Sequence, residues 1–390
     1  MQHHDTDRRD FLRTLALGGF VATVLPHIPS GFLHAEDPPL TPKTNIAEAL
    51  AVPRTAQSMP GLYPGRVVDV QDDTCVANGV PDNERAMKML ERAMLELTGA
   101  ASLKEAWLRF VTPEDYIGLK VNPVAGKLLS TSHAITLAVI AQLEQAGIPR
   151  DRIVIWDRRE FELHETGFTR EAYPGIRIWG AECKDASGSF YDERKMLYSL
   201  DRIDESVYYW ADCEESYDEE TLPYMINEGK FSYFHSLLTQ ELTKVINIPI
   251  LKNAGSSVTL CMKNLAYGAI SNTARLHKQL WAETCAQVPC FEPLRDKTVL
   301  NIVDGMIGCY NGGPAANPQF ITEFKRILVG SDPVATDRVG YDIVLAKRIA
   351  EGVQKQESPR AIGFMTMAES YKLGVADPAR ITHVKTSLKG

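Results

Sequence analysis

Two spacings of apolar residues alternate along most of the chain. Short apolar runs, typical of buried strands, are followed by longer segments in which apolar residues recur at every third or fourth position, as in helices. The first spacing predicts strands at residues 66–70, 115–121, 151–156, 244–251, 298–303 and 326–329, with an edge strand at 380–385. The second predicts helices at 82–98, 132–147, 234–242, about 257–267, 333–351 and 359–373. This alternation predicts an α/β fold, in which a mostly parallel, doubly wound sheet lies between two helical layers.

Two segments interrupt this rhythm. Residues 36–65 are rich in proline, which blocks regular strand pairing, and we expect an extended lead-in that wraps the domain. Residues 158–230 are rich in tyrosine, tryptophan and acidic residues, and we expect an irregular insertion over one end of the sheet. Its acidic stretch, residues 212–220, lacks the order of a calcium-binding loop and is interpreted as a solvated face. The predicted organisation is a single α/β domain at 66–390 that contains this insertion.

Residues 1–35 have the features of a bacterial export signal. Arg8 and Arg9 are followed by Phe11-Leu12 and a further basic residue, and an apolar stretch at 15–25 comes next. Adjacent arginines before such a stretch indicate the twin-arginine route, with cleavage after Ala35. The alternative is an amphipathic N-terminal helix with a chance arginine pair. The signal predicts a periplasmic or otherwise extracytoplasmic protein, with the twin-arginine translocase as a partner during export.

The charge of the chain limits its partners. The formal net charge is −8, and removal of residues 1–35 takes away equal numbers of acidic and basic residues. A mildly acidic surface argues against nucleic acid as a partner. The 7 cysteines include no Cys-x-x-Cys pair and no ferredoxin spacing, so the sequence indicates no iron–sulfur motif. Disulfide pairing is left open.

The first candidate segment follows the strand predicted at 115–121. Lys120 lies inside this otherwise apolar strand, and a buried ammonium is costly unless it is paired or binds a ligand. Asn122 follows it, and Ser130 and Thr131 precede a helix. Hydroxyl groups and free N–H groups at a helix start bind anions, but they also cap helices. Both interpretations are left open for the hydroxyl residues.

The second candidate segment follows the strand predicted at 244–251. The pairs Lys252-Asn253 and Lys263-Asn264 flank a turn that contains Ser257. Two cations and two amides near one helix start suit a phosphate or a carboxylate. The alternative is a surface lysine on each side of a loop. The turn does not have the order of a P-loop.

Three further residues could transfer a proton or bind a metal ion. His277 could act as a general base or a metal ligand, although a lone histidine is more often a satisfied polar residue. Asp157 and Asp304 come at strand ends, where carboxylates bind metals or orient lysines. The alternatives are an Asp-Gly turn at Asp304 and a local pair of Asp157 with its neighbouring arginine. Asp332 is predicted to cap the helix that begins at residue 333.

On these segments the chain resembles the bacterial and archaeal family catalogued as domain of unknown function 362. The matching stretches are residues 117–125, 130–156 with Asp157, 244–265, 304–314 and 328–337. The two Lys-Asn pairs are the most specific element. Some members of this family carry a ferredoxin-type iron–sulfur module, which would imply a redox role, but this chain lacks the corresponding cysteine motif. The resemblance implies no particular activity.

Three functional hypotheses follow. In the first, the chain is an exported α/β protein that binds an anionic substrate or cofactor at the carboxyl ends of the strands. The stronger form of this hypothesis is that the protein is an enzyme. The anion would be bound by lysines 120, 252 and 263 and oriented by asparagines 122, 253 and 264. A proton would be transferred by His277, Asp304 or Lys252.

In the second, the chain is a binding protein or an accessory subunit of an extracytoplasmic redox complex. It would dock through residues 158–230 onto a protein partner or a second copy. In the third, Asp157, Asp304 and His277 hold the metal ion of a hydrolase. The identity of any cofactor is left open.

Overall fold

A mixed β-sheet forms the middle layer of the fold. The computed structural model describes residues 41–182, 201–213 and 229–388, and its main strands lie in the order β15, β1, β14, β12, β9, β4, β5, β6. Their bounds are β1 (Arg66–Gln71), β4 (Ile117–Lys120), β5 (Ile153–Arg159), β6 (Arg177–Glu182), β9 (Lys244–Asn247), β12 (Thr298–Cys309), β14 (Arg326–Gly330) and β15 (Thr382–Ser387). Strand β14 runs antiparallel to both neighbours, and the other neighbouring pairs along this order are parallel. The predicted mostly parallel sheet is confirmed.

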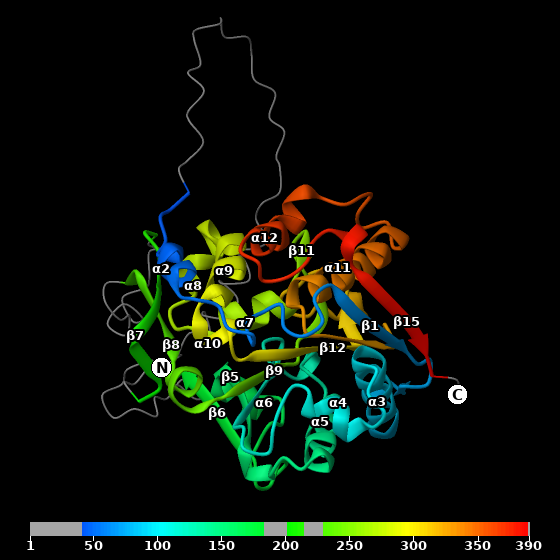
Figure 1. The fold of residues 1–390 in the computed structure, drawn as a ribbon. Coiled ribbons are helices and arrows are strands. Elements are labelled where there is room, and N and C mark those ends of the chain that lie inside the picture. The colour runs from blue at the N-terminus through cyan, green and yellow to red at the C-terminus, as the bar shows by residue number, and fades with distance from the viewer. Residues whose placement is uncertain (1–40, 183–200, 214–228, 389–390) are drawn as a thin grey trace, which may run out of the picture. The chain divides into compact units, whose positions relative to one another are not determined.

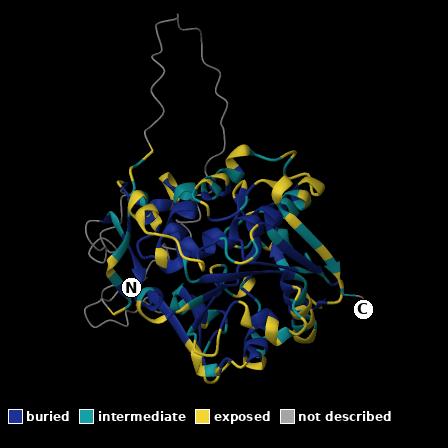
Figure 2. Ribbon diagram, viewed as in Figure 1, coloured by how far each residue is buried: buried dark blue, intermediate teal, exposed yellow. Residues whose placement is uncertain are grey.

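Helices cover both faces of this sheet (Figure 1). One layer contains α3 (Asn83–Thr98), α4 (Leu103–Leu108) and α5 (His133–Ala146), and the other contains α7 (Cys261–Ala269), α9 (Trp281–Gln287), α11 (Pro333–Ala350) and α12 (Pro359–Ser370). Successive strand residues enter opposite cores, since Val67 packs in the core with α11 and Val68 in the core with α3. The central strands are therefore buried on both faces (Figure 2). The predicted three-layer α/β arrangement is confirmed.

The helix ends follow local sequence signals. The side chain of Asp82 accepts a hydrogen bond at the start of α3, and Gly99 ends this helix with a left-handed φ of 65°. Ser132 caps α5 and Gly147 closes it. Asp332 caps α11 with Pro333 in the first turn, as predicted. Within the described ranges, the structure contains no helix with the length and apolar character needed to span a bilayer.

The prediction for residues 234–258 was partly wrong. The predicted helix at 234–242 begins instead as strand β8 (Phe231–His235), paired with β7 (Ile203–Trp210), and a π-helical turn follows at Leu237–Glu241. Tyr208 packs against Phe231 with ring centroids 5.0 Å apart, and aromatic pairs of this kind favour a strand.

The predicted strand at 244–251 is divided in two. Strand β9 ends at Asn247, and β10 (Ile250–Ala254) then pairs with a later part of β12, because Pro249 has no N–H group with which to continue the ladder. The helix predicted from about residue 257 begins at Cys261, and its expected first residues form strand β11 (Ser257–Val258). A short strand, β13 (Ile321–Thr322), also pairs with β12.

The two irregular segments contain more regular structure than expected. The lead-in includes the short helix α2 (Ile46–Ala51), and an isolated bridge joins Thr44 to Ala211. The segment predicted as an insertion begins at the last two residues of β5 and continues into α6 (Glu160–Glu165), and its strand β6 extends the main sheet. The fold also contains the short helices α8 (Ala274–Gln279) and α10 (Glu292–Arg295) and a hairpin of β2 (Val76–Ala77) and β3 (Val80–Pro81). The predicted signal at 1–35 and most of the acidic stretch at 212–220 lie outside the described residues.

Candidate functional site

Several of the predicted site residues meet at the carboxyl ends of the parallel strands. In the sheet, Lys120 at the end of β4 lies between Asn247 of β9 and Trp156 of β5. Helix α7 packs against β5 and β9 and brings Asn264 to this edge. Strand β10, which carries Lys252, lies beyond the end of β9. Parallel pairing therefore gathers residues that are far apart in sequence, as expected for the ligand edge of an open α/β sheet.

A chain of side-chain hydrogen bonds begins at Lys252. Its Nζ donates to Asn122 Oδ1 at 2.8 Å, and Asn122 Nδ2 donates to Asn264 Oδ1 at 2.9 Å. Asn264 Nδ2 donates in turn to Asn247 Oδ1 at 2.8 Å. The chain thus crosses from β10 through the end of β4 to α7 and β9. All four side chains are buried, and each uses its amide or ammonium group within the protein.

The same chain continues to the start of α11. Asn247 Nδ2 donates to Asn301 Oδ1 at 2.9 Å, and Asn301 Nδ2 donates to the carbonyl oxygen of Ser331 at 3.2 Å. We call Asn122, Asn264, Asn247 and Asn301 the amide chain. The direction of donation along this chain is fixed by the groups at its two ends. The ammonium group of Lys252 can only donate a hydrogen bond, and the carbonyl oxygen of Ser331 can only accept one. Asn247 and Asn301 were missed by the sequence analysis, although Asn301 interrupts an apolar strand as Lys120 does.

Lys120 is neutralised within the protein. Its Nζ forms an ion pair with Asp157 and donates to the Val121 carbonyl at 2.8 Å and to Asn264 Oδ1 at 3.1 Å. Burial lowers the pKa of Lys120, and the charge of Asp157 opposes this shift. Because these three bonds use the three protons of the ammonium group, Lys120 positions Asn264 and Asp157 and has no proton left for a ligand.

Room for Lys120 depends on Gly268 of α7. A Cβ atom at this position would overlap Lys120 Cε and would lie 2.6 Å from Nζ. The bare backbone of the helix therefore forms one wall around the ammonium group, and Gly268 was also missed by the sequence analysis.

The helix start near Ser130 and Thr131 is occupied by a carboxylate of the protein itself. Asp304 Oδ2 accepts a hydrogen bond from Ser132 N at 2.8 Å. Burial raises the pKa of Asp304, and its hydrogen bonds with Ser132 and Met306 oppose this shift. Thr131 Oγ1 donates to a backbone carbonyl at 2.7 Å, and Ser130 Oγ donates to the Thr131 carbonyl at 3.3 Å. The geometry favours capping over ligand binding for these hydroxyl residues.

The start of α7 is occupied in the same way. Asp337 of α11 accepts hydrogen bonds from Cys261 N at 2.6 Å and Met262 N at 3.1 Å. Burial raises the pKa of Asp337 to about 7, and these hydrogen bonds oppose the shift. Both helix starts at this edge thus carry a carboxyl group of the protein at the positive end of the helix dipole.

Two further lysines at this edge differ from Lys120 in their surroundings. Lys252 is 1% exposed and Lys263 is 7% exposed, and neither forms an ion pair with any residue that the structure describes. Lys263 Nζ lies 5.3 Å from the centre of the Tyr267 ring. Burial and then the charge of Lys263 lower the pKa of Lys252 to about 7, and burial lowers the pKa of Lys263. This pair is the positive centre of the candidate site.

His277 lies near this pair but makes local contacts. Its Nδ1 is 3.0 Å from the Thr273 carbonyl, and its ring packs 4.2 Å from that of Tyr267. Burial, Lys263 and Arg158 lower the pKa of His277 to about 3, so the ring is neutral at neutral pH.

Each of the three candidate metal ligands contacts a different part of the protein. Asp157 pairs with Lys120, Asp304 caps α5, and His277 packs on Tyr267. Across the described ranges there is no group of three or more histidine, cysteine, aspartate and glutamate side chains placed to hold a metal ion. The three candidates therefore form no such group, and the metal-site interpretation stays a prediction.

Two further predicted residues have structural contacts. Asn253 Oδ1 accepts a hydrogen bond from Gly313 N at 2.8 Å, and its Nδ2 donates to the Gly255 carbonyl at 2.9 Å. Ser257 Oγ donates to the Ala361 carbonyl of α12. These contacts hold the β10–β11 hairpin, and they do not join the two residues to the amide chain.

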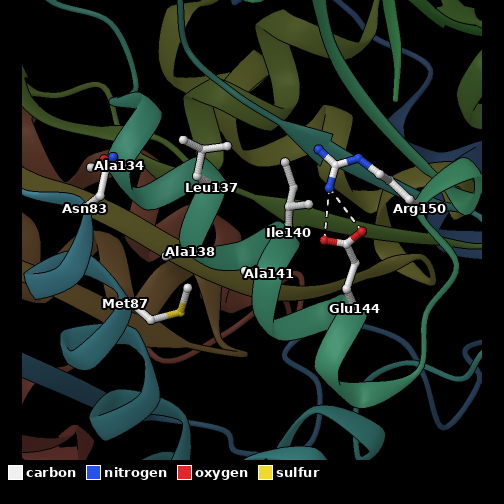
Figure 3. A pocket seen from close by; sticks show the side chains of 9 residues that line it. All are labelled: Asn83, Met87, Ala134, Leu137, Ala138, Ile140, Ala141, Glu144 and Arg150. Atoms are coloured by element: carbon white, nitrogen blue, oxygen red, sulfur yellow. Dashed lines mark hydrogen bonds and ion pairs between the residues drawn. The ribbon is translucent and has the colours of Figure 1, made fainter. Parts of the chain in front are cut away.

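A surface hollow lies elsewhere on the molecule. It has a volume of about 210 Å³ and lies between α3 and α5, in the helical layer opposite α7 (Figure 3). Apolar side chains such as Met87 and Leu137 line it, and an ion pair between Arg150 and Glu144 closes one side. It contains none of the predicted site residues.

The fold and this edge define a three-layer α/β protein with a buried lysine–asparagine cluster at the carboxyl ends of its strands. Residues 212–342 match the family described as "Domain of unknown function (DUF362)". The resemblance is therefore confirmed over a segment that contains both Lys-Asn pairs and Asp304. A search of curated proteins found no match.

One solved structure is similar in part. It is a crystal structure of a protein from Thermotoga maritima, determined by a structural genomics consortium, and it is 7% identical to this chain. The TM-score is 0.37, and the match covers 70% of this chain and 60% of the other. The chain thus spans about 60% of the length of that protein.

We predict that Gly268→Ala destabilises the fold. The new methyl group would displace Lys120 from Asp157, at a cost of about 2 kcal/mol or more. Gly363→Ala is the matched control, because Gly363 lies in α12 with no atom within 4 Å of the added Cβ. That change should be neutral or stabilising by up to about 1 kcal/mol. Urea unfolding measures both, and equal effects of the two variants would contradict the proposed contact.

We also predict that Lys252 makes the free energy of unfolding depend on pH. Its pKa is about 7 in the folded protein, against an ordinary value of 10.5. Between these values the unfolded chain binds a proton that the folded protein lacks, so this group makes stability rise with pH across the window. The unfolding free energy of Lys252→Met should lack that rise, which we expect to be on the order of a few kcal/mol.

Urea unfolding at several pH values between 7 and 10.5 tests this prediction. The control is Lys88→Met, which removes an exposed lysine of α3 that pairs with Glu84 and should keep the wild-type pH dependence. Parallel pH profiles for wild type and Lys252→Met would mean that Lys252 titrates normally.

Proposed function

We propose that the chain is an exported α/β protein that binds a small anion between Lys252 and Lys263. The observation that carries this proposal is the pair of buried lysines without an ion-pair partner among the described residues. Burying an ammonium group without compensation is costly, and a bound carboxylate or phosphate would supply the missing charge. The carboxyl edge of an open α/β sheet is also where such ligands bind.

The neighbouring charges support these two lysines over the other candidates. Asp157 neutralises Lys120, and Asp304 and Asp337 occupy the starts of α5 and α7. A ligand that entered this edge would therefore find its unmet positive charge at Lys252 and Lys263. Since both side chains are nearly enclosed, the ligand must be small, and it must displace neighbouring side chains as it enters.

An enzymatic role is supported by the titration of Lys252. A lysine whose pKa is about 7 exchanges a proton readily at neutral pH, and strongly shifted groups of this kind are common at catalytic sites. The charge of a bound anion would raise this pKa, so binding should be accompanied by proton uptake.

Export is supported by the N-terminal sequence. Arg8-Arg9, the following Phe11-Leu12 and the apolar stretch at 15–25 have the order of a twin-arginine signal. We propose that the working form is extracytoplasmic and that the twin-arginine translocase carries it there.

Thermal unfolding with added anions tests the binding site. Oxalate, phosphate and sulfate are the probes, compared at constant ionic strength with sodium chloride. We expect at least one of them to raise the Tm of the wild type by several degrees, because a ligand that binds the folded state stabilises it. Lys263→Met should lose this increase and should be more stable than wild type without an anion, because it removes a buried charge.

Lys88→Met is the control and should keep the anion response of the wild type, because Lys88 is exposed and pairs with Glu84 of α3. An anion response that is the same in wild type and Lys263→Met would place the binding site elsewhere.

Fractionation of a bacterial host tests export. The double variant Arg8→Lys/Arg9→Lys should remain in the cytoplasm at full length, whereas the wild type should appear outside it with a new N-terminus near Glu36. Recovery of both proteins from the cytoplasm, uncleaved, would argue against the signal.

A further inference from the structure

The amide chain orients the amino group of Lys252. Lys252 Nζ donates one proton to Asn122 Oδ1 at 2.8 Å. Asn122 cannot reverse its amide, because its Nδ2 donates to Asn264 and the far end of the chain meets a carbonyl oxygen. The Lys252 side chain makes no other hydrogen bond with the residues that the structure describes. A neutral Lys252 amine would therefore keep one proton on Asn122 and direct its lone pair away from it.

The three buried lysines of this edge differ in what they can do. Lys120 is held in its charged form by Asp157. Lys263 lies over the face of Tyr267, and an aromatic face favours the charged form of an ammonium group. Among the described residues, Lys252 has neither a paired carboxylate nor an aromatic face, and the charge of Lys263 acts against its protonation. A desolvated lysine beside a second cation is a recognised arrangement for a nucleophilic amine.

We propose that Lys252 forms an imine with the carbonyl carbon of a small oxo acid whose carboxylate is bound by Lys263. This inference rests on the proposed anion site and names its substrate class. A carboxylate suits Lys263, whose charged form the Tyr267 ring favours, and an electrophilic carbonyl suits the amine whose lone pair is free. Because the charge of Lys263 acts on Lys252, a single small molecule that reaches both side chains must carry the two groups close together.

The covalent step is balanced without a further reactant. The Lys252 lone pair attacks the carbonyl carbon, and the carbonyl π electrons move to oxygen. A proton passes from the nitrogen to this oxygen, which gives a carbinolamine. The nitrogen then forms the C=N bond as the oxygen leaves with the second amine proton as water. Amine and carbonyl thus become imine and water, and nothing is oxidised or reduced.

Reductive trapping of the full-length protein tests the proposal. Pyruvate is added with sodium cyanoborohydride at neutral pH, and modified lysines are located by peptide mass spectrometry. We expect Lys252 to be labelled well ahead of exposed Lys88. Propanal is the probe without a carboxylate, and lactate is the competitor without a carbonyl. Lactate should slow labelling by pyruvate and should give no adduct of its own.

Two variants separate the roles of the lysines. Lys252→Arg keeps a cation but cannot form an imine, so labelling at this position should be lost while the lactate-induced rise in Tm remains. In Lys263→Met, Lys252 should still react with propanal but should lose its preference for pyruvate by about tenfold, the equivalent of one charge-assisted contact.

The outcomes distinguish this inference from the proposed function. A Lys263-dependent rise in Tm with lactate, without an adduct on Lys252, would overturn the imine and leave the anion site standing. No rise in Tm and no adduct would overturn both. Labelling of Lys88 and Lys252 at equal rates would show that Lys252 is an ordinary amine.

Discussion

The hydrogen-bonded chain from Lys252 to the start of α11 ties together the elements of the candidate site. Asn122, Asn264, Asn247 and Asn301 belong to β4, α7, β9 and β12 or to their ends, and each buried amide is both a donor and an acceptor. An amide in such a chain cannot rotate without breaking two bonds in the interior, where an unpaired polar group is expensive. The geometry of the edge is therefore set by hydrogen bonding as well as by the apolar packing of the two cores.

Charge compensation divides the buried charged residues of this edge into two groups. Asp157, Asp304 and Asp337 all carry buried carboxyl groups, and each is engaged by a cation or by backbone N–H groups. Lys120 is the corresponding structural cation. Lys252 and Lys263 have the same chemistry and the same burial, but no carboxylate is paired with them in the described ranges. The role of a residue here follows from its partner and cannot be read from its type.

The local features of the fold could be predicted from the sequence, and the long-range ones could not. Apolar periodicity and capping residues such as Asp82 and Asp332 predicted most strands and helices. The reversed direction of β14 depends on pairing with distant strands and has no local signal. The candidate site was predicted as a set of residues at strand ends, and the structure brings Lys120, Asn122, Lys252 and Asn264 together. It could not be known from the sequence that Asp304, 172 residues away, takes the place of an anion beside Ser132.

The amide chain and the lysine at its start, Lys252, contribute differently to stability. A fully satisfied amide network costs little and makes the surrounding structure more rigid. The ammonium group at its start lowers stability, because it is desolvated and lies beside a second cation. Apolar side chains of similar length would fill the same space without this cost. Proteins retain local destabilisation of this kind where a site needs it. The unfavourable position of Lys252, held in one orientation by the network, is therefore consistent with the proposed binding role.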